Sequence, residues 1–475
     1  MSYPMETFAP EWEEWIDLNL RLGNCRQIMF QKSLEAGYSH ALLKRKIGVD
    51  YRAPVQMHEQ IRALDRVPTV ALRTAQRLQA KNLEIFRVDG FLSPQECADI
   101  VATINASELT ESATYNVSNP TERIVNADRT SKTCYFGGTS PLIADVESRI
   151  CKMMGINNRH AEQIQGQKYT VGQEFRFHTD YFDPELLKKD ASINGQRTWT
   201  FMIYLNDVEE GGHTSFPRAY CSCAPKTGNA IVWNNLYSQA SSLNAGDWGR
   251  ENPFSSHCGM PIIRGEKYIL TKWFKETEIN PSTPNEICEH HFMPVFHPVG
   301  FEKVRMRLDC VDAVKEWMRR DNEDQWTDET INGDGVDSGM VSKHLKLDAA
   351  PIKLLNELRD TFREILTKWI EYKAPLTHTA TYGIRKYLCG SQLANHYDKK
   401  NTHVLSAIIH LDDDASDKPW NLYIEDHHFR PHNVTMEYGD IVLYESTTCL
   451  HGRPEPFEGL AHCNMYIHFK PDSWN

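Results

Sequence analysis

The first 84 residues show a helical pattern of hydrophobic and polar positions. An amphipathic run begins with Trp12, Trp15, Ile16, Leu18 and Leu20, and Met29, Leu34, Leu42 and Leu43 continue the pattern of one helix face. Pro54 and Pro68 interrupt the pattern, and the segment from Val70 to Lys81 is again rich in residues that favour helices. We therefore expect a helical N-terminal region over residues 1–84. It contains no motif that suggests chemistry, and its simplest role is packing against the next domain.

The pattern changes to that of β-strands after residue 84. Ile85–Val88 is a short apolar run, and Ser93-Pro94-Gln95-Glu96 then predicts the start of a helix with Ser93 as its N-cap. Later strand-like runs are separated by Gly, Asn and Pro: Thr198–Leu205, Thr214–Phe216, Ala230–Trp233 and Lys267–Phe274. Such a series of short strands predicts a jelly-roll barrel, which we place at residues 85–277.

Similar patterns return in the second half of the chain. Residues 278–298 are rich in Pro and irregular, and they predict a linker. A strand is expected at Phe301–Leu308, a helix at Val311–Arg319 and an amphipathic helix at Ile352–Tyr372. We expect a second barrel over residues 299–475. The predicted fold class is α+β, with two double-stranded β-helix (jelly-roll) barrels, flanking helices and the helical N-terminal region.

Composition and charge narrow the class of protein and its partners. The chain has 475 residues, enough for two or three domains, with 40% hydrophobic and 24% charged residues, as in a globular protein. A net charge of −12 without a basic block argues against a nucleic-acid partner. No run approaches the roughly 20 apolar residues of a membrane span, and the N-terminus lacks the apolar core of a secretory signal. The 12 cysteines are scattered, so we expect free thiols in a cytoplasmic protein. The sequence does not indicate an oligomeric state.

The first candidate site is a His-x-Asp motif that ends a β-branched and aromatic run. On a strand, residues two apart point to the same face, so His178 and Asp180 can hold one metal ion together. His257, far along the chain, offers a third ligand, and Lys267 follows it by ten positions. Two histidines and one carboxylate with open positions opposite them form the facial triad of non-haem Fe(II) oxygenases.

Around this motif the chain resembles the prolyl 4-hydroxylase family of Fe(II)/2-oxoglutarate oxygenases. The resemblance runs from about Ile85 to Lys275 and includes the triad with its following lysine. It also includes Arg129-Thr130-Ser131, Tyr169 and the run from Tyr204 to Gly212.

The resemblance implies a complete reaction. Fe(II) would be held by the triad, and Lys267 would pair with the distal carboxylate of 2-oxoglutarate, with Tyr169 and Thr200 adding hydrogen bonds. With O2, such an enzyme hydroxylates a C–H bond and releases succinate and CO2; ascorbate is a further cofactor that the resemblance suggests. The expected substrate is a prolyl residue or another peptide, protein or amino-acid-derived molecule. Arg129 and Arg197 could line its cleft or form structural ion pairs.

A second candidate site follows the same pattern near the C-terminus. Tyr387 precedes His396 by nine positions, as Tyr169 precedes His178, so we expect Tyr387 to bind the cosubstrate of a second site. Asp398 and His451 complete a second triad with His396. The counterpart of Lys267 is His462, a weaker carboxylate partner. Arg453 could replace it, because a planar guanidinium binds a carboxylate through two hydrogen bonds. The second barrel could thus bind its cosubstrate differently, bind iron without turnover, or be a folded relic.

Two other functions stay open for the whole chain. One is a tailoring oxygenase that acts on a small natural product. The other is a protein in which only the first barrel reacts and the second binds a substrate or partner. Three further polar clusters are interpreted as surface loops or an exposed turn: His290-His291, His427-His428 and Asp412-Asp413-Asp414.

Overall fold

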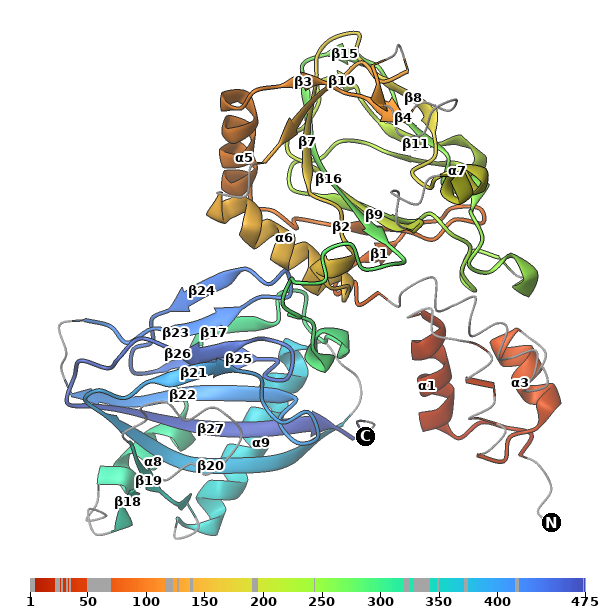
Figure 1. The fold of residues 1–475 in the computed structure, drawn as a ribbon. Helices are drawn as coiled ribbons and strands as arrows, with labels where there is room; N and C mark the ends of the chain where they lie inside the picture. The colour runs from red at the N-terminus through yellow and green to blue at the C-terminus, as the bar shows by residue number, and fades with distance from the viewer. Residues whose placement is uncertain are drawn as a thin grey trace. The chain divides into compact units, whose positions relative to one another are not determined.

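The computed structural model divides the chain into two compact units, Met1–Ile287 (unit 1) and Cys288–Asn475 (unit 2) (Figure 1). It describes residues 5–21, 26, 29–30, 33, 36–48, 70–115, 123–125, 128–136, 140–189, 195–242, 244–319, 325–328, 342–347, 350–370, 375–414, 418–472 and 474. Among these residues, no helix combines the length and the hydrophobicity needed to cross a membrane.

The N-terminal region of unit 1 is helical only in part. Helices α1 (Pro10–Arg21) and α3 (His40–Ile47) contribute to a small buried cluster that includes Ile16 and Leu43. The expected helix over residues 70–81 is wrong. Gln76–Arg77 is instead strand β1, which pairs with the strand at residues 85–88. Leu72 and Thr74 have positive φ angles that a helix cannot contain, so pairing within the sheet overrides helix propensity here. Pro54 and Pro68 lie outside the described residues.

Two antiparallel sheets form the body of unit 1. The eight strands of the large sheet are, in spatial order, β1, β2 (Ile85–Val88), β13 (Ala230–Asn234), β9 (Arg197–Tyr204), β16 (Lys267–Lys275), β7 (Gln165–Tyr169), β6 (Lys132–Tyr135) and β3 (Thr110–Glu111). The four strands of the small sheet are β12 (Cys221–Cys223), β11 (Thr214–Phe216), β14 (His257–Gly259) and β8 (Phe175–His178). Two short pairs accompany them, β10 (Glu210–Gly211) with β15 (Ile262–Arg264) and β4 (Thr114–Tyr115) with β5 (Arg123–Ile124).

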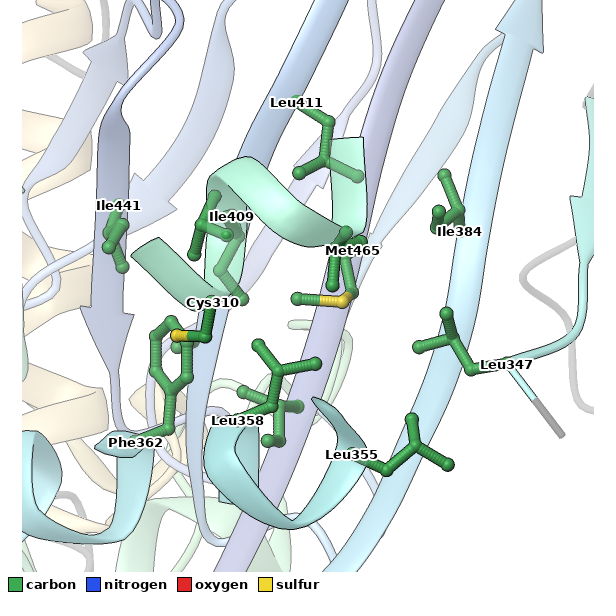
Figure 2. Close-up of a cluster of buried hydrophobic side chains, with 14 of the residues drawn as sticks. Cys310, Leu347, Leu355, Leu358, Phe362, Ile384, Ile409, Leu411, Ile441 and Met465 are labelled. Atoms are coloured by element: carbon green, nitrogen blue, oxygen red, sulfur yellow. The ribbon is translucent and has the colours of Figure 1, made fainter. Parts of the chain in front are cut away.

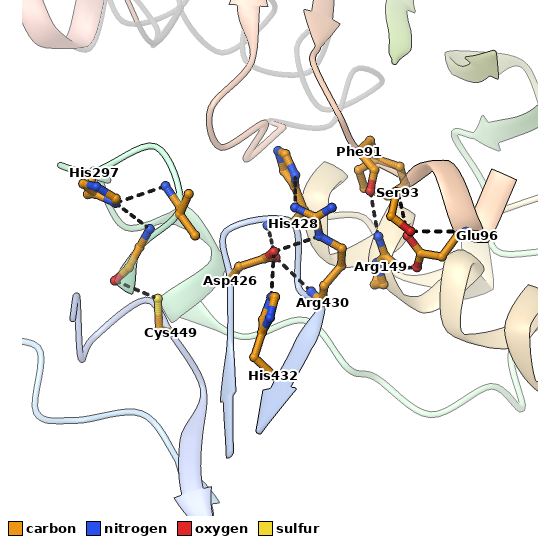
Figure 3. Close-up of polar contacts among 12 residues, drawn as sticks. Phe91, Ser93, Glu96, Arg149, His297, Asp426, His428, Arg430, His432 and Cys449 are labelled. Carbon is orange, nitrogen blue, oxygen red and sulfur yellow. Dashed lines mark hydrogen bonds and ion pairs between the residues drawn. The ribbon is translucent and has the colours of Figure 1, made fainter. Parts of the chain in front are cut away.

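Helices α5 (Pro94–Ala106), α6 (Pro141–Met154) and α7 (Pro184–Lys189) complete unit 1. The predicted start of α5 is confirmed, since the Ser93 hydroxyl accepts from the Glu96 amide and the Glu96 carboxylate accepts from the Ser93 amide. The same Glu96 carboxylate pairs with the buried Arg149 of α6, which also donates to the Phe91 carbonyl at 2.7 Å (Figure 3). The cap and this ion pair together join α5 to α6. Short 3-10 turns lie at Asn158–His160, Pro217–Ala219, Ala245–Asp247 and Pro253–Ser255.

Unit 2 is built from a seven-stranded and a four-stranded antiparallel sheet. The large sheet has the order β17 (Phe301–Arg305), β25 (Asp440–Tyr444), β22 (Leu405–Asp414), β27 (Ala461–Pro471), β20 (Leu376–Leu388), β19 (Ser342–Leu345) and β18 (Thr327–Asp328). The small sheet has the order β21 (Leu393–His396), β26 (His451–Arg453), β23 (Leu422–Glu425) and β24 (Pro431–Val434). A 3-10 turn lies at Glu289–Phe292.

Helices α8 (Asp309–Arg319) and α9 (Ile352–Trp369) lie within or beside the segments that the sequence predicts as helical. Leu358 and Phe362 of α9 and Cys310 of α8 share one buried cluster with Ile409 of β22 and Met465 of β27 (Figure 2). Burying the apolar face of each helix against the sheet is the main stabilising contribution here.

The two units share one strand order. The run β2-β13-β9-β16-β7-β6 in unit 1 has the counterpart β17-β25-β22-β27-β20-β19 in unit 2, and the small sheets also correspond. The α+β class is therefore confirmed, and each unit contains a His-Asp-His triad whose ligand atoms lie close enough together to hold one metal ion. Because the pairing registers are known, positions in one unit can be matched to positions in the other.

Candidate active sites

The first triad is assembled by adjacent strands of the small sheet. His178 on β8 lies opposite His257 on β14, and Asp180 follows two residues after His178. The Nε2 atom of His178 is 3.8 Å from one Asp180 carboxylate oxygen, and that of His257 is 3.9 Å from the other. One nitrogen or oxygen from each residue lies within 4.8 Å of the others. The three groups therefore fit one metal ion.

Backbone contacts orient both imidazoles toward this ion position. The Nδ1 atom of His178 is 2.8 Å from the Arg176 carbonyl oxygen, and that of His257 is 2.9 Å from the Ser255 carbonyl oxygen. A carbonyl can only accept, so each Nδ1 carries the proton and each Nε2 keeps a free lone pair. Burial, and next the neighbouring His257, lower the pKa of His178 to about 3. His178 is thus neutral, as a metal ligand must be.

Asp180 is held as a carboxylate by its neighbours. Burial alone would raise its pKa, but His257 and His178 lower it, and the net pKa lies below the usual value. The Thr200 hydroxyl donates to Asp180 at 2.7 Å and accepts from the Asn235 amide at 2.9 Å. Asn235 in turn accepts from the indole of Trp233 at 3.0 Å. This buried chain fixes the orientation of the ligand carboxylate.

Lys267 is a buried cation in the same cavity as the triad. It lines that cavity together with the triad and Tyr169. Its Nζ donates to the Gly212 carbonyl at 2.7 Å and lies 5.5 Å from the ring centres of Tyr169 and Tyr204. Burial lowers its pKa to about 7. Within the described part of the chain no carboxylate pairs with this ammonium, so a carboxylate of a bound molecule would compensate a charge that the fold leaves desolvated.

Two arginines lie beside this site in different roles. Arg129 lines the cavity and lies 4.9 Å over the ring of Phe175, which stacks on His178. Arg197 forms a two-pronged ion pair with the half-buried Glu162 at 2.6 and 2.7 Å. It also donates to the backbone carbonyl of Asp180 at 3.4 Å. Arg197 therefore supports the backbone segment that carries the metal ligand Asp180.

The second triad repeats the first in geometry. His396 on β21 lies opposite His451 on β26, with ring centres 4.6 Å apart. Their Nε2 atoms are 3.6 and 3.9 Å from Asp398 Oδ1. Each Nδ1 lies against a backbone carbonyl, at 2.8 Å for His396 and 2.9 Å for His451. Burial lowers the pKa of His451 to about 4, so this group of ligands also fits a metal ion.

The surroundings of the second triad differ from those of the first. Tyr387 is fully buried, and its hydroxyl is 2.7 Å from that of Tyr466. Arg453 is 1% exposed, donates to the Trp420 carbonyl and lies 4.8 Å over the Trp420 ring. The structure thus brings both predicted cosubstrate residues of unit 2, Tyr387 and Arg453, to one aromatic cluster around Trp420. Their role in cosubstrate binding stays a prediction.

The interpretation of three polar clusters is wrong in part, because one histidine of each pair is buried and Asp412 lies in a strand. His291 and His427 are 2% and 0% exposed, and His427 lies 3.0 Å from the buried carboxylate of Glu445. Asp412 belongs to β22 and pairs with Arg319 and Lys315 instead of lying in a turn. Consecutive polar residues in sequence carry no signal for such distant partners, which only the fold supplies.

Glu162 and Asn235 were not foreseen from the sequence. Each supports the first site from a strand end or loop that is remote in sequence from the triad. The only sequence signal is a polar residue next to a strand, which is common on any protein surface.

Unit 2 contains another polar network near His428. There Asp426 accepts hydrogen bonds from Arg430 and His432 (Figure 3).

Comparisons with known proteins identify the first site. Residues 164–275 match the 2OG-Fe(II) oxygenase superfamily. The chain is 28% identical to prolyl 4-hydroxylase 2 of Arabidopsis thaliana over 233 residues, which cover 43% of this chain and 74% of that protein. It is 29% identical to a putative prolyl 4-hydroxylase of Acanthamoeba polyphaga mimivirus, covering 41% of this chain and 75% of that protein.

Two further matches have either a smaller aligned share of the two chains or a lower sequence identity. Prolyl 4-hydroxylase subunit alpha-1 of Gallus gallus is 32% identical, but over 31% of this chain and 27% of that protein. A solved structure of the viral collagen prolyl hydroxylase vCPH from Paramecium bursaria Chlorella virus-1 is 24% identical, covering 40% of this chain and 94% of that one, with a TM-score of 0.31. The family implies Fe(II) and 2-oxoglutarate, and the triad and buried Lys267 fit both. The chain is therefore an enzyme whose residues 164–275 match the 2OG-Fe(II) oxygenase superfamily and which is similar to the prolyl 4-hydroxylases.

Proposed function

We propose that unit 1 hydroxylates a C–H bond of a prolyl residue in a peptide or protein, with 2-oxoglutarate and O2 as cosubstrates. The observation that carries the proposal is the single cavity in which the His178-Asp180-His257 triad and the buried Lys267 lie together. The prolyl choice is supported by the names of the relatives, which are prolyl 4-hydroxylases. Bound Fe(II) would supply the oxidation chemistry, with release of succinate and CO2.

The residues of unit 1 would divide this work between binding and orientation. The Nε2 atoms of His178 and His257 and the Asp180 carboxylate hold the metal. The Thr200 hydroxyl keeps Asp180 in one orientation, which is the role that the hydrogen bonds support. Lys267 binds the distal carboxylate of 2-oxoglutarate through a charge-assisted hydrogen bond. Tyr169, whose ring lies 5.5 Å from the Lys267 ammonium, lines the same cavity.

A turnover assay with matched substrates tests the proposal. Purified chain would be supplied with Fe(II), 2-oxoglutarate and ascorbate, and then with proline-containing peptides, the same peptides with alanine in place of proline, or free proline. Mass spectrometry of the product and the succinate yield are the measurements. We expect hydroxyproline only in the proline-containing peptides and none with the His178→Ala variant. Hydroxylation of free proline, or of a small non-peptide molecule alone, would contradict the peptide substrate.

We also propose that the protein works in the reducing cytoplasm. The support is that the described cysteines are free thiols, most of them buried, and reducing compartments keep thiols in this state. Fractionation of cells that express the tagged chain checks it. Recovery in a secretory compartment would contradict it.

A further inference from the structure

We propose that unit 2 holds a second cosubstrate site in which Arg453 binds the distal carboxylate of a 2-oxo dicarboxylic acid. The cation of this site, Arg453, lies on the small sheet of unit 2. The corresponding cation of unit 1, Lys267, lies on the large sheet. The inference goes beyond the function proposed for unit 1, because it concerns a different metal triad and a different set of cosubstrate residues.

The pairing registers match the two sites position by position. In unit 1, Thr200 pairs with Trp233 on one side and Trp273 on the other. In unit 2, Ser406 pairs with Tyr444 and His468 in the same way. The match places Ser406 at the position of Thr200 and His468 at the position of Trp273.

The same registers locate the anchor position. Lys267 pairs with Tyr169, and its counterpart pair is His462 with Tyr387. Unit 2 thus has an imidazole where unit 1 has its buried ammonium. A neutral imidazole can donate only one hydrogen bond and carries no charge, so His462 by itself is a poor partner for a carboxylate.

Arg453 supplies the cation from the opposite sheet. On β26 it pairs with Leu393, as Gly259 on β14 pairs with Phe175, so Arg453 and Gly259 are counterparts. A Cβ atom added to Gly259 would lie 4.0 Å from Lys267 Nζ. A side chain at this position therefore starts beside the anchor of unit 1. At these two matched positions unit 1 has Gly259 and Lys267, whereas unit 2 has Arg453 and His462.

The contacts around Arg453 place its guanidinium near the side chain of His462, which is the counterpart of Lys267. The Asn464 amide is best oriented with its nitrogen toward His410, and its oxygen then accepts from His462 Nε2 at 3.2 Å and from Arg453 Nη2 at 3.3 Å. Arg453 and His462 are therefore neighbours through one shared acceptor. The Trp420 ring covers the guanidinium at 4.8 Å and meets the His462 ring edge-on at 5.2 Å.

This arrangement favours a dicarboxylic 2-oxo acid. A triad with open coordination positions suits a 2-oxo acid group, and a buried guanidinium beside a histidine suits a second carboxylate some distance away. The guanidinium stays charged at every physiological pH, and its planar fork can make two parallel hydrogen bonds. The Trp420 ring would exclude water from that contact.

Binding is tested in a chain whose first metal site is disabled. In the His178→Ala variant, Fe(II) and 2-oxoglutarate would be titrated without oxygen, and the visible charge-transfer band of the chelate would be followed. We expect about one equivalent of band per chain, lost in His178→Ala/His396→Ala. Cobalt(II) absorption reports metal binding by itself. Arg453→Gln is expected to weaken 2-oxoglutarate binding at least about tenfold while cobalt binding is unchanged.

Two controls separate the anchor from general damage. Arg385→Gln removes a nearby half-buried cation that donates to the Tyr387 hydroxyl at 3.2 Å, and it should change 2-oxoglutarate binding less than about threefold. The analogue 2-oxopentanoate lacks the distal carboxylate, and we expect it to bind at least about tenfold more weakly than 2-oxoglutarate. A missing band, equal binding of both acids, or a loss caused by Arg385→Gln instead of Arg453→Gln would overturn the proposal.

A variant that fails to fold leaves the test intact. If Arg453→Gln loses cobalt binding, the preference for 2-oxoglutarate over 2-oxopentanoate is measured in Arg453→Lys. Lysine keeps the charge but loses the fork, so the preference should fall at least about threefold, and an unchanged preference would overturn the assignment. If 2-oxoglutarate does not bind in unit 1, this is detected separately. The charge-transfer band of the His396→Ala variant comes only from the triad of unit 1.

Discussion

The two units differ in the cation that we propose to bind the distal carboxylate of the cosubstrate. In unit 1 a single ammonium, Lys267, lies between the rings of Tyr169 and Tyr204 and donates to one carbonyl. In unit 2 the guanidinium of Arg453 lies under Trp420 and shares an acceptor with His462. The triads themselves are alike. A metal site constrains its ligands to one geometry, whereas a carboxylate can be approached from either sheet.

The largest effect is expected from removing the ammonium of unit 1. Lys267→Ala, measured in the His396→Ala background, should weaken 2-oxoglutarate binding by roughly 30-fold to 5000-fold, because a desolvated charge contact contributes about 2–5 kcal/mol. Titration of the charge-transfer band measures it. The same substitution in the His178→Ala background should leave the band of unit 2 unchanged. A loss there would mean that the two sites are not independent.

The supports of the metal ligands also differ between the units. Thr200 donates to Asp180, whereas its counterpart Ser406 contacts Ser446 and His468. Thr200→Val should therefore lower cobalt affinity of site 1 by about 10-fold to 100-fold. Ser406→Ala should lower that of site 2 by less than about threefold. Equal effects would show that this difference in hydrogen bonding has no consequence for metal binding.

Sequence reasoning located both triads but only part of what surrounds them. The His-x-Asp spacing and the start of a helix at Ser93 are local features, so the chain shows them directly. The strand at Gln76–Arg77 and the buried His427 depend on partners far along the chain, which composition cannot reveal. The exchange of Gly259 and Lys267 for Arg453 and His462 is visible only once the strand registers are known.

The pH dependence of binding should distinguish the two anchors. Burial lowers the pKa of Lys267 to about 7, so the ammonium is charged below that pH and increasingly neutral above it. Since 2-oxoglutarate binds the charged form, its affinity for unit 1 should be constant below about pH 7 and fall by up to about tenfold per pH unit above it. Arg453 does not titrate in this range, so the affinity of unit 2 should stay flat. Titrations at pH 6.5 to roughly 8.5 in the two single-site backgrounds check this.

The exchange of anchors can be tested by reversing it. In the His178→Ala background, Arg453→Gly removes the guanidinium, and His462→Lys places an ammonium at the position of Lys267. Arg453→Gly alone should weaken 2-oxoglutarate binding at least about tenfold. The double variant should recover part of that loss, with a coupling energy of about 1 kcal/mol between the two positions. The cycle compares four dissociation constants, and additive effects would mean that the two positions do not serve one carboxylate. Recovery in the double variant alone would show that the position of the charge, and not the identity of the strand that carries it, decides binding.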